Sequence, residues 1–247
     1  EHRSLNNMAK KSGLGNQFYL GGYDLSGDVG ALNTISSPRG MVDVTGINVS
    51  ATDRLLTHSD GLIEFSSFFN DAALAEHAAL SGLTTADRIA TYLTGSTLGD
   101  SACAMVGKQI NYDGSRTADG GLNFSVSMQG NATPLEWGNS YTAGKVTHAS
   151  ATNVTSIDLG ATSTTNGAQA YLQVFSVASG TAIVKVQDSA DNSSFADQIT
   201  FTGATGITAE RLADTGTYRR YIRVASTGTF SNLVFNVIIR RGTAEDI

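Results

Sequence analysis

The last third of the chain consists of short runs in which apolar and polar residues alternate, and this pattern limits the fold more than any other part of the sequence. Clusters of Gly, Ser, Asn and Asp, which close turns, separate the runs. Alternation places one face of a strand on a core and the other in water, as an antiparallel sandwich requires. The pattern therefore predicts strands at 171–177, 181–187, 198–202, 220–224 and 233–239, with turns at 179–180, 191–194, 214–216 and 227–228.

Charged residues are scarce: they make up 15% of the 247 residues, where a soluble domain normally carries about a quarter. The formal net charge is -6, and residues 8–147 hold the acidic excess, with 8 basic and 13 acidic side chains. A surface rich in Ser, Thr, Asn and Gly but poor in charge suits subunits that pack together. The net charge also argues against the basic footprint of a nucleic-acid-binding protein.

The first half mixes strand and helix signals. Asn70 or Asp71 is placed to cap an Ala-rich helix over 72–80, which we expect to end at Gly82. Residues 84–87 match a capping box that would open a second helix, but the β-branched and aromatic residues that follow favour a strand. We expect a polar hairpin loop at 113–121 and strands at 41–49, 61–69, 88–94, 103–112 and 122–129.

The chain divides best near residue 147, because the polar segment 142–153 has no periodic apolar face and is the best candidate linker. We expect a mainly β domain with one short helix over residues 8–147. A second, all-β sandwich domain of the jelly-roll or galactose-binding-like type would occupy 148–247. Residues 1–7 are an extension of unknown role.

No constellation of reactive side chains is visible. The four histidines show no metal spacing, and neither a P-loop nor a nucleophile elbow is present. Cys103, the single cysteine, reads as a small buried hydrophobe. The acidic segment 188–197 lacks the ligand spacing of a calcium loop and favours a polar hairpin turn. The sequence therefore predicts a protein without enzymatic activity, metal or cofactor.

The remaining conspicuous residues have structural interpretations. For Arg219, Arg220 and Arg223 a strand with carboxylate partners is favoured over nucleic-acid binding. Trp137, the only tryptophan, is expected at a domain or subunit junction. No run reaches the roughly 18 apolar residues of a membrane helix, so we expect a soluble protein without a membrane partner.

An ordered set of segments resembles the major tail tube protein of bacteriophages with long, flexible, non-contractile tails (siphophage type). The resemblance covers most of the chain, and its weight comes from the order of the set, since no single segment carries chemistry. The segments are Thr-Tyr-Leu-Thr-Gly at 91–95, Leu-Gly-Asp at 98–100, Val-Gly-Lys-Gln-Ile-Asn-Tyr-Asp at 106–113, Arg-Thr-Ala-Asp-Gly at 116–120, Pro-Leu-Glu-Trp-Gly at 134–138, Val-Gln-Asp-Ser-Ala-Asp at 186–191 and Arg-Tyr-Ile-Arg-Val at 220–224.

This resemblance implies a tail-tube-like β-sandwich or barrel whose subunits form rings, commonly hexameric, that stack into a tube. The tube conducts the genome into the host, so DNA would pass through it without specific binding. Partners would be further copies of the chain, the tape measure protein and other tail proteins, in a virion tail assembled in the host cytoplasm. Residues 8–30 would form an arm between rings.

Two carboxylates and two tyrosines are candidates for particular surfaces. Asp43 and Glu64 are expected to face the lumen, with exposure on an outer face an equal alternative. The second domain would lie outside the tube; if it were instead tube-like, three chains would complete a ring. Other functions left open are a head-decoration protein and a carbohydrate-binding module with Tyr218 and Tyr221 as its platform.

Overall fold

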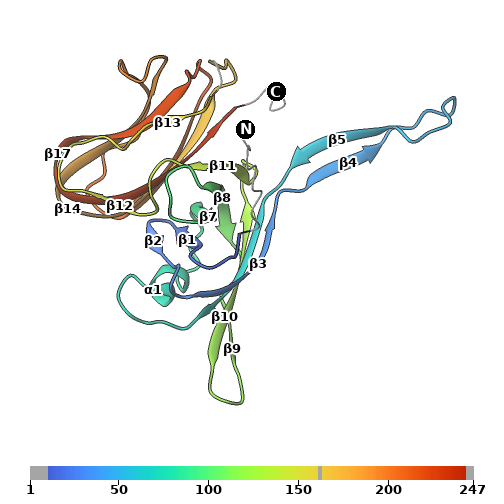
Figure 1. The fold of residues 1–247 in the computed structure, drawn as a ribbon. Coiled ribbons are helices and arrows are strands. Elements are labelled where there is room, and N and C mark those ends of the chain that lie inside the picture. The colour runs from blue at the N-terminus through green and yellow to red at the C-terminus, as the bar shows by residue number, and fades with distance from the viewer. Residues whose placement is uncertain (1–10, 161–162, 243–247) are drawn as a thin grey trace, which may run out of the picture.

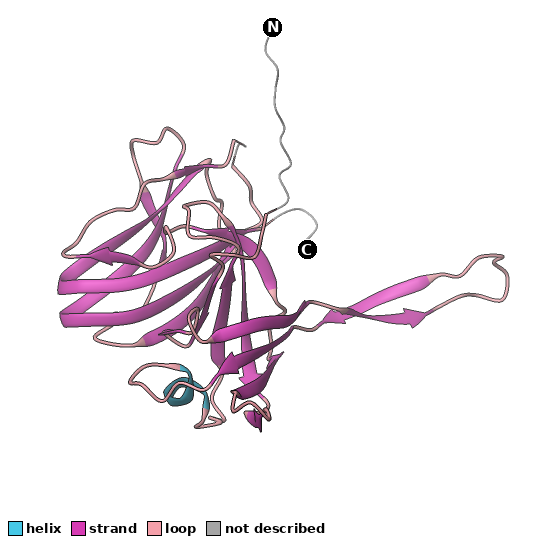
Figure 2. Cartoon of the chain, turned by 60° about the horizontal axis from the view of Figure 1, so that its bottom comes forward, coloured by secondary structure: helices cyan, strands magenta, loops and turns pink. Residues whose placement is uncertain are grey.

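The structure is a computed structural model that describes residues 11–160 and 163–242. The chain is mainly β, as the sequence predicts, with one short helix in the described part. Two lobes share a large, curled antiparallel sheet, and a long hairpin projects from the first lobe (Figures 1 and 2).

The first lobe forms where alternate residues of its strands meet on one face. Ile63 and Phe65 on one strand and Val126 and Met128 on its neighbour lie in the same core cluster. The neighbouring positions between them point to the other face of the sheet. The elements are β1 (Gln17–Leu20), β2 (Tyr23–Asp24), β3 (Val29–Ser36), β6 (Leu62–Phe68), α1 (Glu76–Leu80), β7 (Arg88–Leu93), β8 (Ser101–Gln109), β9 (Asp113–Arg116) and β10 (Leu122–Gly130).

Several predictions for the first lobe hold and others need correction. The strand over 88–94 is confirmed by β7, and no helix opens at 84–87. The helix is shorter than 72–80 because Asn70 accepts a hydrogen bond from the backbone of Ala72 in a turn, and Leu74 has a φ of 65°. The predicted loop 113–121 is wrong in its first half, since β9 pairs with β10.

The predicted arm at 8–30 is also wrong for its described part. Phe18, Tyr19 and Leu20 on β1 and Leu25 after β2 are all buried in the first lobe. Strand β1 lies between β2 and β7 in the sheet, so this segment is a core element. Residues 8–10 lie outside the described residues.

The second lobe is built on two long strands that pair along their whole length, from Ala168 opposite Arg241 to Ser189 opposite Tyr221. Tyr218, Phe235 and Leu172 are among the buried side chains of its core. The predicted strands at 171–177, 181–187 and 233–239 lie within these two long strands, whereas the prediction at 220–224 begins one residue early and that at 198–202 runs two residues past its strand. The strands are β12 (Val146–His148), β13 (Ile157–Asp158), β14 (Ala168–Ser189), β15 (Ala196–Thr200), β16 (Thr208–Asp214) and β17 (Tyr221–Arg241).

The turns predicted at 179–180 and 227–228 are bends inside β14 and β17. Gly180 has a φ of 81° and Gly228 a φ of 99°, which a side chain would disfavour. A Cβ on Gly180 would also lie 2.1 Å from the backbone oxygen of Thr229 on the paired strand. Glycine here lets two paired strands curve together around a core, a role it often has in barrels and sandwiches.

The two lobes are joined by sheet, core and buried polar contacts. Strand β11 (Glu136–Ser140) pairs with β8 of the first lobe and β17 of the second. Gln173 on β14 is buried; its side chain donates to Ile89 and Thr91 of the first lobe and accepts from Gly22. The proposed boundary at 147 falls inside β12, which pairs with β17, and the division into domains stays a prediction.

Candidate assembly surface

The most exposed feature of residues 11–160 and 163–242 is the projecting hairpin of β4 (Arg39–Asp43) and β5 (Arg54–Ser59), called the arm below. It forms its own two-stranded sheet, with Met41 opposite Leu56 and Asp43 opposite Arg54. At about 3.3 Å per residue, nine or ten residues per side give it a length of roughly 30 Å. Figures 1 and 2 show it extending away from both lobes.

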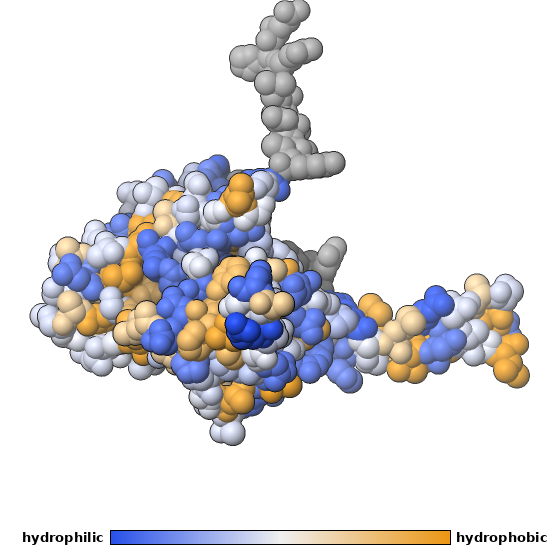
Figure 3. All heavy atoms as spheres, turned by 90° about the horizontal axis from the view of Figure 1, so that it is seen from below, coloured by the Kyte–Doolittle hydropathy of each residue, from blue (hydrophilic) through white to orange (hydrophobic). Residues whose placement is uncertain are grey.

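The arm carries apolar side chains that are exposed to solvent. Because neighbouring strand residues point to opposite faces, Met41 and Val42 expose apolar groups on both sides. The orange surface along the arm in Figure 3 shows the same composition. An isolated hairpin is marginally stable, and contiguous exposed apolar surface marks contact sites. The large apolar side chains of the arm that are 49% to 109% exposed are Met41, Val42, Val44, Ile47, Val49, Leu55 and Leu56.

A second surface is polar and nearly uncharged. It is the face of β3, β6 and β10 that points away from the first-lobe core. Thr34 lies opposite Glu64, and Glu64 lies opposite Ser127, so the three share this face. The Thr34 hydroxyl donates to the Glu64 carboxylate at 2.8 Å. Strands β3, β6 and β10 contain no Lys or Arg, and Glu64 is their single carboxylate.

The structure separates the two predicted lumen carboxylates. Glu64 lies on the polar face of the body, whereas Asp43 lies on the arm. The backbone amide and the hydroxyl of Thr45 both donate to Asp43, and these bonds hold its pKa below the ordinary value. Their common orientation toward a lumen stays a prediction.

Trp137 lies on β11 opposite Cys103 and is 49% exposed. The described chain therefore leaves about half of the Trp137 side chain accessible to solvent. Burial of Trp137 at a subunit junction stays a prediction. Cys103 is buried, as expected, and burial raises the pKa of its thiol to about 12. A thiol so protected is unreactive at neutral pH.

The prediction that Tyr218 and Tyr221 form a carbohydrate-binding platform is wrong. Tyr218 is fully buried in the second-lobe core, and the guanidinium of Arg220 lies over the ring of Tyr221, 5.0 Å from its centroid. The expected carboxylate partners of the arginines are confirmed at two positions. Arg219 pairs with Asp188 and Arg220 with Asp158, both at 2.6 Å.

The Asp188 carboxylate is buried, but it is well satisfied. It accepts hydrogen bonds from the backbone and side chain of Arg219 and from the side-chain amide of Gln198. Burial opposes the charge, yet the bonds from Arg219 outweigh it and hold the pKa of Asp188 below the ordinary value. This pair fixes the segment before β17 on β14.

The acidic segment 188–197 is a turn between β14 and β15, as predicted. The Asp191 carboxylate accepts from the backbone amides of Ser193 and Ser194 at 2.9 Å, and these bonds lower its pKa to about 2. Within residues 11–160 and 163–242, no cluster of three or more His, Cys, Asp or Glu is arranged to hold a metal. None of the described helices has the length and apolar composition needed to cross a membrane.

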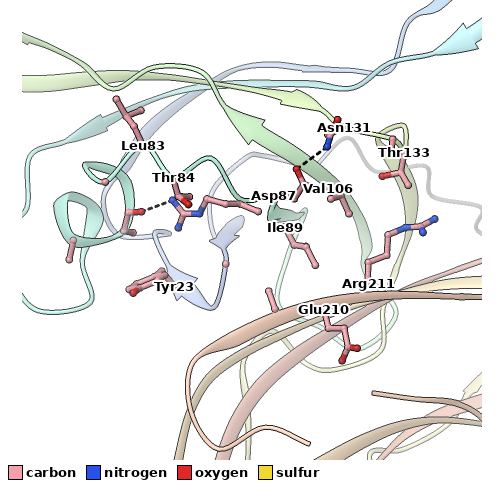
Figure 4. A pocket seen from close by; sticks show the side chains of 17 residues that line it. Tyr23, Leu83, Thr84, Asp87, Ile89, Val106, Asn131, Thr133, Glu210 and Arg211 are labelled. Carbon is pink, nitrogen blue, oxygen red and sulfur yellow. Dashed lines mark hydrogen bonds between the residues drawn. The ribbon is translucent and has the colours of Figure 1, made fainter. Parts of the chain in front are cut away.

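A groove of about 710 Å³ lies between the lobes, where α1 and β7 face β16 (Figure 4). Leu83, Ile89 and Val106 contribute apolar walls, while Asp87 and Arg211 add charge. The Asp87 carboxylate lies 2.7 Å from the ammonium of Lys108, and Arg211 pairs with the buried Glu136 of β11 at 3.4 Å. The sequence does not reveal this groove, because segments of its walls, such as 83–89 and 209–211, lie more than a hundred residues apart.

No protein-family model and no curated protein matches the chain. Among solved structures it is similar to the tail of an empty GTA particle with C6 symmetry, at 17% identity and a TM-score of 0.40, over 52% of this chain and 98% of that chain. It is also similar to the SPP1 Dit protein, described as a paradigm of the hub adsorption apparatus in phages that infect Gram-positive hosts, at 10% identity and a TM-score of 0.34 over 92% and 99%.

A further similar structure is the phage P2 baseplate in its activated conformation with calcium, at 10% identity and a TM-score of 0.31, over 92% of this chain and 98% of that chain. The three descriptions name a tail, a hub adsorption apparatus and a baseplate.

Proposed function

We propose that the chain is a structural, non-enzymatic protein of a phage tail that assembles with copies of itself into stacked rings. The rings form the tail tube, through which the genome leaves the virion. The arm is the observation that carries this proposal. Seven large apolar side chains stand exposed on a hairpin that no other part of the described chain covers.

The energetics of the arm favour a partner. Fully burying a large aliphatic side chain gains about 1.5–3 kcal/mol, and the seven side chains are at least about half exposed. Covering them would therefore contribute roughly 7 kcal/mol before the entropy lost on association. A surface of this kind on a long hairpin suits a contact made in every copy of a repeating assembly.

The polar face of β3, β6 and β10 is the proposed lumen surface. A conduit for DNA must not bind the phosphates tightly. Nonspecific affinity for DNA comes mainly from Lys and Arg side chains, which contact phosphates and release the cations condensed on them. The three strands offer no such cation, and Glu64 repels phosphate. The second lobe, whose β17 pairs with β11, would lie on the outside of the tube, with the tape measure protein and other tail proteins as further partners.

Electron microscopy of the purified protein tests the proposal. Negative staining over a concentration series should show rings or tubes for the wild type. A matched variant replaces residues 40–58 with an Asn-Gly turn, which removes the arm and leaves the core of both lobes intact. This variant should stay monomeric at every concentration. A wild type that remains monomeric throughout, or an armless variant that assembles as well as the wild type, would contradict the proposal.

A further inference from the structure

The groove between the lobes contains a cation that the described chain leaves without a carboxylate partner. Arg88 opens β7 and is half-buried in the groove wall. Its Nη1 donates to the backbone oxygen of Ala79 at 2.5 Å and to Oε1 of Gln109 at 3.1 Å, both neutral acceptors. Its Nε and Nη2 donate to no group in residues 11–160 and 163–242. Burial lowers the pKa of Arg88, but an arginine keeps its charge at neutral pH.

Such an arginine is unusual, because buried cations are normally paired with an anion. The other charged side chains that line the groove already have partners: Asp87 pairs with Lys108, Arg211 pairs with Glu136, and the Glu210 carboxylate accepts from the backbone amide and the hydroxyl of Thr202. Arg88 therefore still has donors to offer a carboxylate that enters from outside. The apolar walls around it would strengthen such a contact by excluding water.

The arm carries a matching group. Asp53 lies just before β5, among the exposed apolar residues of the arm, and its carboxylate accepts no hydrogen bond within the described chain. Asp43 differs, because Thr45 already occupies its carboxylate. Asp53 is thus a carboxylate without an ionic partner on an apolar hairpin, and Arg88 is a guanidinium without an ionic partner in a partly apolar groove.

The arm and the groove lie on opposite sides of the body. In Figures 1 and 2 the arm extends to the right, and α1, whose Ala79 lines the groove, lies to the left. The arm of one copy therefore points away from its own groove. A second copy placed head to tail presents its groove to that arm, and repetition of such a contact generates a ring or a helix.

We propose that the arm of one copy docks in the groove between the lobes of the next copy, with the Asp53 carboxylate on the Arg88 guanidinium. Apolar side chains of the arm then cover Leu83 and the neighbouring groove wall. This inference rests on the proposed self-assembly and names the surface that receives the arm.

Charge reversal tests the contact in the full-length chain. Arg88→Glu and Asp53→Arg should each raise the concentration needed for assembly by at least about tenfold, since each places like charges together. The double variant restores opposite charges and should assemble near the wild-type concentration. Asp119→Arg, at the tip of the β9–β10 hairpin, makes the same charge change on another exposed loop and should leave assembly unchanged.

Thermal unfolding of each variant, measured below the assembly concentration, separates loss of contact from loss of fold. Asp53→Arg changes only an exposed arm side chain, so it keeps the test valid even if Arg88→Glu unfolds. Single variants that assemble at the wild-type concentration, or a folded double variant that does not, would overturn the groove as acceptor while self-assembly stands. A wild type that never assembles would overturn both proposals.

Discussion

Replacement of Asp188 by asparagine removes a buried negative charge and keeps the shape of the side chain. In the wild type, the backbone amide, Nε and Nη2 of Arg219 all donate to this carboxylate, at 2.6 to 3.0 Å. Breaking a buried ion pair on one side costs about 3–5 kcal/mol. The Arg219 side chain is 32% exposed and regains some hydration, so the lower end applies, about 3 kcal/mol.

For a chain of this length, 3 kcal/mol lowers the melting temperature by roughly 6 to 12 °C. Circular dichroism at a concentration below assembly measures this shift. Asp197→Asn is the matched control: its carboxylate pairs with Lys185 at 2.6 Å on the surface, and its loss should cost less than about 1 kcal/mol. If Asp188→Asn melts no lower than this control, the structural role of the pair is refuted.

The same comparison has a pH signature. The pKa of Asp188 is lower in the folded than in the unfolded chain, so its contribution to stability is fully present above the unfolded value of about 4. It is lost as the pH falls through the folded pKa. The gap in melting temperature between the wild type and Asp188→Asn should therefore be constant near neutral pH and shrink in acid. A gap that widens in acid would contradict the assignment.

Three further predictions concern the arm, a strand bend and the tryptophan. The double variant Leu55→Ser with Leu56→Ser should raise the concentration needed for assembly about 30-fold, because it loses about 2 kcal/mol of apolar burial in the contact. Light scattering measures this concentration, and calorimetry should show an unchanged melting temperature of the monomer. A large drop in monomer stability would contradict the exposure of the arm. Gly180→Ala should destabilise the fold by about 2 kcal/mol in chemical unfolding, because alanine is strained at positive φ, and an unchanged midpoint would refute the bend. Trp137, the single tryptophan, should shift its fluorescence to the blue on assembly if it lies at a subunit junction, and an unchanged spectrum places it outside the contact.

The strand interiors could be predicted from sequence, because alternation in segments such as 61–69 and 122–129 reports directly which residues face a core. The bends at Gly180 and Gly228 could not, since the same glycine signal marks a turn or a curved strand. Only the pairing of β14 with β17 over their whole length distinguishes the two. The predicted helix over 72–80 is longer than α1 for a related reason. High helix propensity in this segment does not reveal that Leu74 adopts a positive φ.

The assembly surface was harder to predict. Val42 and Val44 mark a strand by composition, but alternation does not tell whether a face meets its own core or another subunit. The sequence instead favours an arm between rings at 8–30, where Phe18 and Tyr19 are buried in the first lobe. The groove depends on how two lobes meet, so Arg88 carries no local signal beyond being an arginine at the start of a strand.

A three-dimensional reconstruction of the assembled wild-type protein would locate the arm and the face that bears Glu64 within the assembly. We expect repeating copies in which each arm is covered by a neighbouring copy and the face bearing Glu64 lines a central channel. An assembly in which the arms project freely into solvent, or in which that face packs against another subunit and leaves no channel, would contradict it.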